Sequence, residues 1–239
     1  MRADELFRAG KLEEAIDLLG VELRKNPADA QQRIFLFELL CFAGEHDRAE
    51  KHLDVLAMGN RQVEMGVLLY RAALHAERTR QAMFRTGDYP QSGPTPRDVA
   101  GILNGRPFQE LRDADPRIGA RLEVFAAGQY LWIPFEHIAT VRMAAPKRLR
   151  DLLWAPAVVR PGAAFRGLEL GEVMLPALAP LSWQHSEAGV RLGRVTDWTE
   201  LEDSRQVPLG QKLLLVDGEE FPVLELRELE ILQRNGAAG

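Results

Sequence analysis

The sequence LEVFAAGQYLWIPFEHIATVRMAAPKRLRDLLW, residues Leu122–Trp154, is the densest run of aromatic and β-branched residues in the chain. Apolar side chains alternate with others on both sides of residues 126–129, which predicts two strands joined by a tight turn. Gly128 can adopt the positive φ that such a turn requires. This part of the stretch therefore predicts a β-hairpin.

The rest of the stretch predicts short elements of both kinds. Pro134 ends the second strand and suits the first turn of a short helix, after which Thr140–Met143 can return as a strand. A second short helix is expected over Lys147–Trp154. Elements of this length are not stable alone, so the rest of the chain must supply the layer on which they pack.

The overall composition is that of a soluble globular protein. The chain has 239 residues, of which 46% are hydrophobic and 27% are charged, enough for one large domain or two modest ones. The formal net charge of −5 is spread evenly, because residues 1–90 carry 13 basic and 15 acidic side chains and the remainder carry 17 and 20. An even, slightly acidic charge argues against a nucleic-acid-binding face.

Targeting signals are not evident in the sequence. The N-terminal residues lack the apolar core of a signal peptide, and the longest apolar run, Ile34–Ala43, is interrupted by Glu38 and too short to span a bilayer. The single cysteine, Cys41, excludes an internal disulfide. We therefore expect a cytoplasmic protein without membrane insertion.

The first 60 residues show an internal repeat. Ala9–Ala15 recurs loosely 34 residues later as Ala43–Ala49, with glycine at the turn and alanine in the following helix. Such a period is typical of the tetratricopeptide repeat, in which glycine allows the tight turn and alanine lets the helices approach closely. We expect helices over residues 2–9, 12–25, 29–43, 46–57 and 61–83. They form either a partner-binding face or a helical layer packed on a second domain.

A linker and a second domain should follow this helical domain of residues 1–84. Residues 85–96 concentrate Gly, Pro and Ser, which predicts a domain boundary. In the expected domain of residues 97–239, Thr95 and Pro96 suggest the start of a helix that ends at Gly105, and Pro107–Ala114 suggests another.

The later part of this domain predicts further strands. Residues 157–159 and 171–179 are apolar runs punctuated by proline, better suited to edge strands and loops than to central strands. Asp217-Gly218 predicts the turn of a second hairpin, and Leu226–Gln233 suggests a terminal helix. Antiparallel hairpins with separate short helices predict an α+β fold: an N-terminal all-helical, tetratricopeptide-like region followed by a mixed domain.

No catalytic or metal-binding constellation is visible in the sequence. The five histidines, His46, His52, His75, His137 and His185, fit neither an HExxH nor a paired-cysteine pattern. Glu136 and His137 are adjacent, so their side chains diverge, and no nucleophile motif accompanies them. No glycine-rich phosphate-binding loop is present either. We expect a protein that is not an enzyme and that needs no cofactor and no metal.

Five separate segments of the sequence resemble the ImpE family, also called TagJ or SciE. They are EVFAAGQYLWIPFEHI (residues 123–138), APKRLRDLLW (145–154), VMLPALAP (173–180), VRLGRVTDW (190–198) and GQKLLLVDGEEFPVLELRELE (210–230). The resemblance implies a non-enzymatic accessory protein of bacterial type VI secretion. It also implies contact with the N-terminal helix of the small sheath subunit TssB, and a link to sheath disassembly by the ATPase ClpV.

A surface that receives an amphipathic helix would suit such a role. The hypothesis places it on Leu122–Trp154, called the organising stretch here, with apolar contacts from the aromatic residues and basic residues at the rim. The candidate residues are Tyr130, Trp132, Phe135, Trp154, Arg148 and Arg150. The alternative is a generic tetratricopeptide-like adaptor that binds another peptide, or ClpV itself, on the concave face of residues 1–83. An enzymatic role would require Glu136 or His137.

Overall fold

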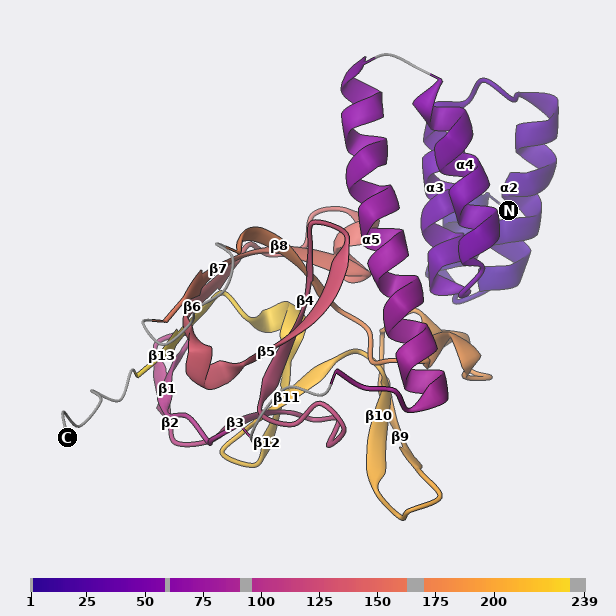
Figure 1. Ribbon diagram of the computed structural model, residues 1–239. Helices are drawn as coiled ribbons and strands as arrows, with labels where there is room; N and C mark the ends of the chain where they lie inside the picture. The colour runs from indigo at the N-terminus through magenta and orange to yellow at the C-terminus, as the bar shows by residue number, and fades with distance from the viewer. Residues whose placement is uncertain (1, 59–60, 91–95, 163–169, 233–239) are drawn as a thin grey trace, which may run out of the picture.

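The computed structural model describes residues 2–58, 61–90, 96–162 and 170–232 of the chain. Helices come first, and the strands that follow pair with antiparallel neighbours throughout the described part (Figure 1). The predicted α+β class, helical at its N-terminus and mixed afterwards, is confirmed.

The N-terminal helices lie where the sequence predicted them, within three residues at each end. They are α1 (Ala3–Arg8), α2 (Leu12–Lys25), α3 (Ala30–Phe42), α4 (His46–Ala57) and α5 (Arg61–Thr86). Gly10 and Gly44 form the turns after α1 and α3 with φ of 78° and 72°. Ala15 and Ala49 are fully buried where the following helices pack. The small residues thus serve the turns and close packing expected of them.

The largest sheet has eight strands. In spatial order they are β2 (Arg106–Phe108), β1 (Gly101–Leu103), β13 (Glu228–Ile231), β6 (Ile138–Met143), β7 (Trp154–Pro161), β8 (Gly171–Pro176), β4 (Arg121–Ala126) and β5 (Gln129–Pro134). The predicted hairpin of β4 and β5 is present, with Gly128 at φ 79° in its turn. The strand predicted at Thr140–Met143 belongs to β6.

Two smaller sheets complete the strands. A three-stranded sheet has the order β12 (Glu219–Pro222), β11 (Leu213–Val216) and β3 (Leu111–Asp113), and it contains the predicted hairpin at Asp217-Gly218. A ribbon of β9 (Thr196–Glu200) and β10 (Gln206–Gly210) projects from the body below α5 (Figure 1). Single helical turns join the strands: η1 (Phe135–His137), η2 (Leu149–Leu152), η3 (Ser182–Gln184), α6 (Ala188–Arg191) and η4 (Val223–Glu225).

The large sheet has two differently covered faces. Its inner face contributes Val124, Val159 and Leu175 to a core that also includes Leu214 and Val223 from the β11 region. Its opposite face, called the outer face here, packs against the C-terminal half of α5 over β4 and β5 (Figure 1). Because strand side chains alternate between faces, each central strand can serve both layers.

A second core joins the helices to the outer face. It contains residues of all five N-terminal helices together with outer-face side chains such as Phe125, Trp154 and Met174. The helical and mixed regions are therefore packed on each other. The domain boundaries at residues 84 and 97 stay a prediction, and residues 91–95 of the predicted linker lie outside the described residues.

The turns of the helical repeat contact the segment between β8 and β9. A Cβ atom on Gly44 would collide with the indole of Trp183. Arg194 donates to the carbonyl oxygens of Phe7 and Arg8 at the end of α1, at 2.6 and 2.9 Å. The helical layer was expected either to bind a partner or to pack on a second domain. At the end that carries the Gly10 and Gly44 turns, it packs on the mixed region.

The two helices predicted over residues 95–114 are wrong. Residues 101–113 form β1, β2 and β3 instead, and Thr95 lies outside the described residues. The turn between β1 and β2 is Asn104-Gly105, with φ of 48° and 80°. Asn-Gly is the strongest two-residue hairpin signal, and it overrides the helix start suggested by Pro96.

Four later predictions are also corrected. Residues 157–159 and 171–176 lie in the central strands β7 and β8, because Pro161 and Pro176 end those strands and leave the ladder intact. Residues 228–231 form β13, with Leu229 and Ile231 buried on alternate positions, rather than a helix. The helix expected over Lys147–Trp154 is only the turn η2.

Candidate protein-interaction groove

Arg80, on the C-terminal half of α5, is fully buried beside the large sheet. Its Nε donates to Oε1 of Glu123 at 2.7 Å, and its Nη2 donates to Oε2 of the same carboxylate at 3.0 Å. The Nη2 atom also donates to the carbonyl oxygen of Leu178 at 2.9 Å. A bidentate pair of this kind fixes both the position and the rotation of α5 on β4.

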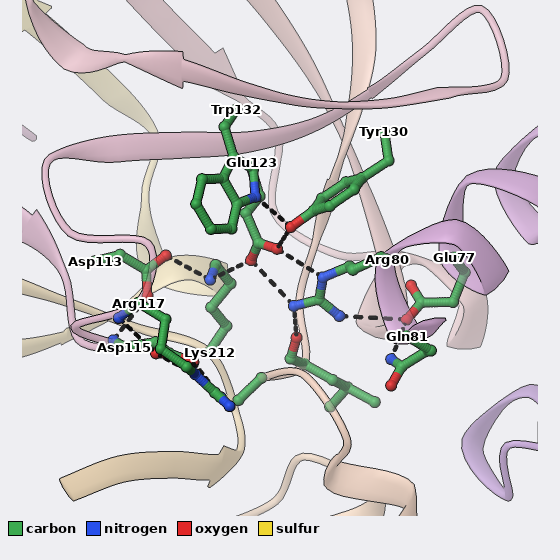
Figure 2. Close-up of polar contacts among 12 residues, drawn as sticks. Glu77, Arg80, Gln81, Asp113, Asp115, Arg117, Glu123, Tyr130, Trp132 and Lys212 are labelled. Carbon is green, nitrogen blue, oxygen red and sulfur yellow. Dashed lines mark hydrogen bonds and ion pairs between the residues drawn. The ribbon is translucent and has the colours of Figure 1, made fainter. Parts of the chain in front are cut away.

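Figure 2 shows this ion pair continuing on both sides into one chain of contacts. The ammonium of Lys212 lies 2.5 Å from a carboxylate oxygen of Asp113 and 2.5 Å from one of Glu123. On the helix side, Nη1 of Arg80 donates to Oε1 of Glu77 at 3.2 Å. Glu77, Arg80, Asp113, Glu123 and Lys212 form the junction cluster, which ties α5 to β3, β4 and the segment before β11.

Burial and the mutual charges act in opposite directions on the junction cluster. Burial alone would raise the pKa of Glu123, but Arg80 and Lys212 outweigh it and hold the pKa at about 2. Burial raises the pKa of Asp113 more than Lys212 lowers it, and the neighbouring Glu123 carboxylate adds to the rise. Glu123 is therefore the permanent anion that holds the two cations together.

Aromatic residues of the organising stretch surround the junction cluster. The hydroxyl of Tyr130 donates to Glu123, and the indole N–H of Trp132 donates to the oxygen of Tyr130. The indole N–H of Trp154 donates to Oε2 of Glu77 at 3.1 Å. Their polar atoms add hydrogen bonds to Glu77 and Glu123, while their rings fill the space between α5 and the sheet.

The junction cluster is closed to molecules of substrate size. A cavity of about 20 Å³ lies beside Glu77 and Arg80, with Cys41 and His46 in its wall. That volume holds about one water molecule. Since the charged groups bind one another and leave no room for a substrate, the arrangement serves to fix α5 on the sheet.

A larger hollow lies next to this junction, between α5 and the outer face of the sheet. It has a volume of about 480 Å³ and is called the outer-face groove here. Apolar side chains from α5 and from strands β4, β7 and β8 line it: Leu69, Ala72, Ala73, Phe125, Val158 and Met174. Its apolar lining and open shape suit an elongated apolar ligand better than a small polar one.

The strand register accounts for the floor of the groove. Pro156 of β7 pairs with Met174 of β8, which pairs in turn with Phe125 of β4. In the next outward-facing row, Val158 pairs with Glu172 of β8. These side chains share the outer face; Phe125 and Met174 are buried in the core beneath the helices, whereas Val158 is 37% exposed.

The α5 wall presents more apolar surface than a helix facing water normally does. Leu69 is 52% exposed and Leu68 is 53% exposed, and Met65 precedes them on the same face. Residues 65, 68, 69 and 72 follow the i, i+3, i+4, i+7 spacing of one helical stripe. This α5 stripe continues the groove beyond the end of the sheet, so the exposed apolar surface is contiguous.

The sequence-predicted site residues divide into two groups. Tyr130, Trp132, Phe135 and Trp154 are buried. Tyr130 and Trp154 bind the junction cluster, and Trp132 donates to Tyr130. Their use as an exposed contact surface stays a prediction. Arg148 is exposed and lines the outer-face groove.

Arg150 is half-buried and already has partners in the protein. Its guanidinium lies over the ring of Tyr70 at 4.7 Å from the centroid, and its Nη1 lies 3.8 Å from a carboxylate oxygen of the buried Glu38. Sequence reasoning missed the α5 wall, although the stripe of residues 65, 68, 69 and 72 was a readable signal. It missed the junction cluster because nothing in one sequence connects Arg80 with Glu123.

The candidates for catalysis and metal binding do not come together. Glu136 lies in η1 and accepts a hydrogen bond from the backbone N–H of Arg97 at 3.3 Å, a local structural contact. Within residues 2–58, 61–90, 96–162 and 170–232, no three His, Cys, Asp or Glu side chains are grouped as metal ligands. In the same residues, no helix combines the length and apolarity needed to cross a bilayer.

Comparisons with known proteins agree over nearly the whole chain. Residues 105–230 match the model of the ImpE protein family. The type VI secretion system accessory component TagJ of Pseudomonas aeruginosa is 31% identical, covering 96% of this chain and 91% of its own. The crystal structure of protein VPA1032 from Vibrio parahaemolyticus has a TM-score of 0.84 at 23% identity, over 97% of this chain and 98% of that one. At that identity the structural likeness establishes the fold alone.

Proposed function

The chain belongs to the ImpE family, and we propose that it is a cytoplasmic, non-enzymatic accessory protein of a type VI secretion system. In this proposal it binds the N-terminal helix of the small sheath subunit TssB in the outer-face groove. Holding that helix modulates assembly of the contractile sheath or its disassembly by ClpV. The identity to a named accessory component of that system supports the general role.

The single observation that carries the binding mode is the uncovered outer face. Helices α3 and α5 cover this face over β4, β5 and the Trp154 end of β7, whereas Val158 farther along β7 is 37% exposed and its neighbour Glu172 on β8 is exposed as well. A sheet with an apolar face is stable when another layer packs on it. An amphipathic helix laid beside α5 supplies that layer and buries its own apolar stripe in doing so.

The shape of the groove supports a helix over an extended peptide. Its lining is made of side chains that stand on the sheet and on α5, not of unpaired backbone groups at a strand edge. Beta-strand addition needs such an edge, and β7 and β8 each have a neighbour on both sides. The expected contacts are therefore apolar side chains at helical spacing.

The alternative function is a generic tetratricopeptide-like adaptor that binds a different peptide on the concave face of the helices. The paired turns at Gly10 and Gly44 favour a repeat of this kind. Contacts of Trp183 and Arg194 with those turns, however, use one end of the helical layer internally. Retention of the partner by groove variants would favour this alternative.

Calorimetric titration of the full chain with a synthetic TssB N-terminal helix, and with a scrambled peptide, tests the proposal. We expect a dissociation constant of about 1 μM or tighter, or about −8 kcal/mol. Val158→Glu should abolish binding, and Val21→Glu is the matched control, because both valines are 37% exposed and Val21 lies on α2 away from the groove. Equal binding by both variants would refute the groove as the site.

A further inference from the structure

Some of the charged side chains at the rim of the outer-face groove already have ion-pair or hydrogen-bond partners in the protein, and others have none among the described residues. Arg142 is paired with Glu228, its Nη2 lying 2.7 Å from a carboxylate oxygen. The carboxylate of Asp151 accepts the backbone N–H groups of Lys147 and Arg148 at 2.9 Å each. Both rim charges are thus committed to partners in the protein itself.

Arg148 and Glu172 are the exceptions. Both are exposed and line the groove, and neither guanidinium nor carboxylate has an ion-pair partner within the described part of the chain. The neighbouring Arg150 differs, because Glu38 and the Tyr70 ring hold it. Among the described residues, the groove therefore offers one unpaired cation and one unpaired anion to an occupant.

The two charges lie against different parts of the groove floor, Glu172 beside Val158 and Arg148 near Tyr70. Glu172 pairs in the sheet with Val158, whereas Arg148 precedes η2, which leads directly into Trp154 at the start of β7. Trp154 and Val158 are four residues apart on one strand, which corresponds to about 13 Å. A helix rises about 11 Å in two turns, so on an occupant that runs along this strand, residues roughly seven or eight apart on one face match that spacing.

We propose that the outer-face groove selects an amphipathic helix with an acidic residue that pairs with Arg148 and a basic residue about two turns away that pairs with Glu172. The inference rests on the proposed function for the site and adds the charge pattern of the occupant. The apolar floor supplies the contact area, and the two rim charges fix the register and direction of the helix. A helix with the opposite charge order meets like charges at both ends.

Charge reversal in the full chain tests this pattern. Arg148→Glu should weaken binding of the TssB helix by about tenfold, since an attraction becomes a repulsion at a partly exposed rim. Lys147→Glu is the matched control, because Lys147 is the adjacent exposed cation and does not line the groove. Replacing the paired acidic residue of the peptide with lysine should restore affinity to Arg148→Glu alone.

A designed amphipathic helix separates failure of this inference from failure of the proposed function. One version carries Glu and Lys seven residues apart, and the other carries the same two residues exchanged. Stronger binding of one version, reversed in the double variant Arg148→Glu with Glu172→Arg, supports the inference even where the TssB peptide does not bind. Equal affinity for both versions, or equal effects of Arg148→Glu and Lys147→Glu, overturns it and leaves TssB binding intact.

Discussion

Replacing Arg80 with methionine tests the role of the junction cluster. Methionine keeps much of the buried volume but removes the guanidinium that donates to both carboxylate oxygens of Glu123. Because Glu123 and Arg80 are both fully buried, the variant leaves a carboxylate with only Lys212 as its cation. Breaking a buried pair in this way costs about 3–5 kcal/mol of unfolding free energy. For a chain of this size, that lowers the melting temperature by about 6–20 °C.

Arg78→Met is the control within the same helix. Arg78 pairs with Asp47 at 2.7 Å and with Glu50 at 2.8 Å, but the Asp47 side chain is 93% exposed and that of Glu50 is 42% exposed. The loss should therefore stay below about 1 kcal/mol. Urea unfolding at pH 7, followed by tryptophan fluorescence and by far-ultraviolet circular dichroism, measures both variants.

A double-mutant cycle separates the ion pair from simple loss of packing. Arg80→Met combined with Glu123→Gln removes both charges, so the combined loss should be smaller than the sum of the single losses by more than about 1 kcal/mol. Two findings would refute the reasoning: a loss for Arg80→Met as small as that for Arg78→Met, or strictly additive losses in the cycle.

Two further perturbations test other contacts. Gly44→Ala and Gly87→Ala both place alanine at positive φ, 72° and 78°, but only Gly44 faces the Trp183 ring. In thermal unfolding, Gly87→Ala should lower the unfolding free energy by about 1 kcal/mol, and Gly44→Ala should lower it clearly more. Burial raises the pKa of Glu38 from 4.5 to about 7, so this carboxyl group destabilises the folded state increasingly as pH rises between those values. Glutamine cannot ionise. From pH 4 to pH 8, the unfolding free energy of Glu38→Gln should therefore rise relative to that of the wild type by up to about 3 kcal/mol, measured by urea titration.

The parts of the fold that sequence predicted are those with local signals. Each N-terminal helix is defined by its own apolar stripe and turn residues, and the hairpins at Gly128 and Gly218 are defined by glycine at positive φ. Asn104-Gly105 was an equally local signal, but the helix-start pattern at Pro96 masked it. The strand β13 had no such signal, because it is defined by pairing with β1 and β6, far away in the sequence.

The site was predicted only in part for the same reason. Aromatic residues such as Trp132 and Trp154 suit a buried junction as well as an exposed contact, and which of these they form depends on where α5 packs. Arg80 and Glu123 are 43 residues apart, and their pairing follows from the tertiary arrangement alone. Arg148 has the solvent exposure expected of a basic residue in a short turn, whereas Arg150, two residues later, is held by Glu38 and the Tyr70 ring, which no local signal indicates.

The outer-face groove follows from a mismatch in length. Helix α5 has 26 residues and spans about 39 Å, whereas a six-residue strand such as β4 spans about 20 Å. The hairpin tip reaches α5 at Ala72, where a Cβ atom on Gly128 would lie 3.5 Å from the Cβ atom of Ala72. The part of α5 before Ala72 therefore extends past the sheet and exposes Leu68 on the α5 stripe.

Because the part of α5 before Ala72 is exposed, we predict that a longer partner helix binds more tightly. A TssB peptide that continues by two turns past Leu69 covers Leu68 and Met65, which are 53% and 67% exposed. Burying the rest of each side chain contributes about 1 kcal/mol, so the longer peptide should bind roughly tenfold or more tightly in calorimetric titration. Leu68→Glu should weaken binding of the longer peptide and leave the shorter one unchanged. If the two peptides bind equally to the wild-type chain, the occupant does not follow α5, and the groove must be filled along another direction.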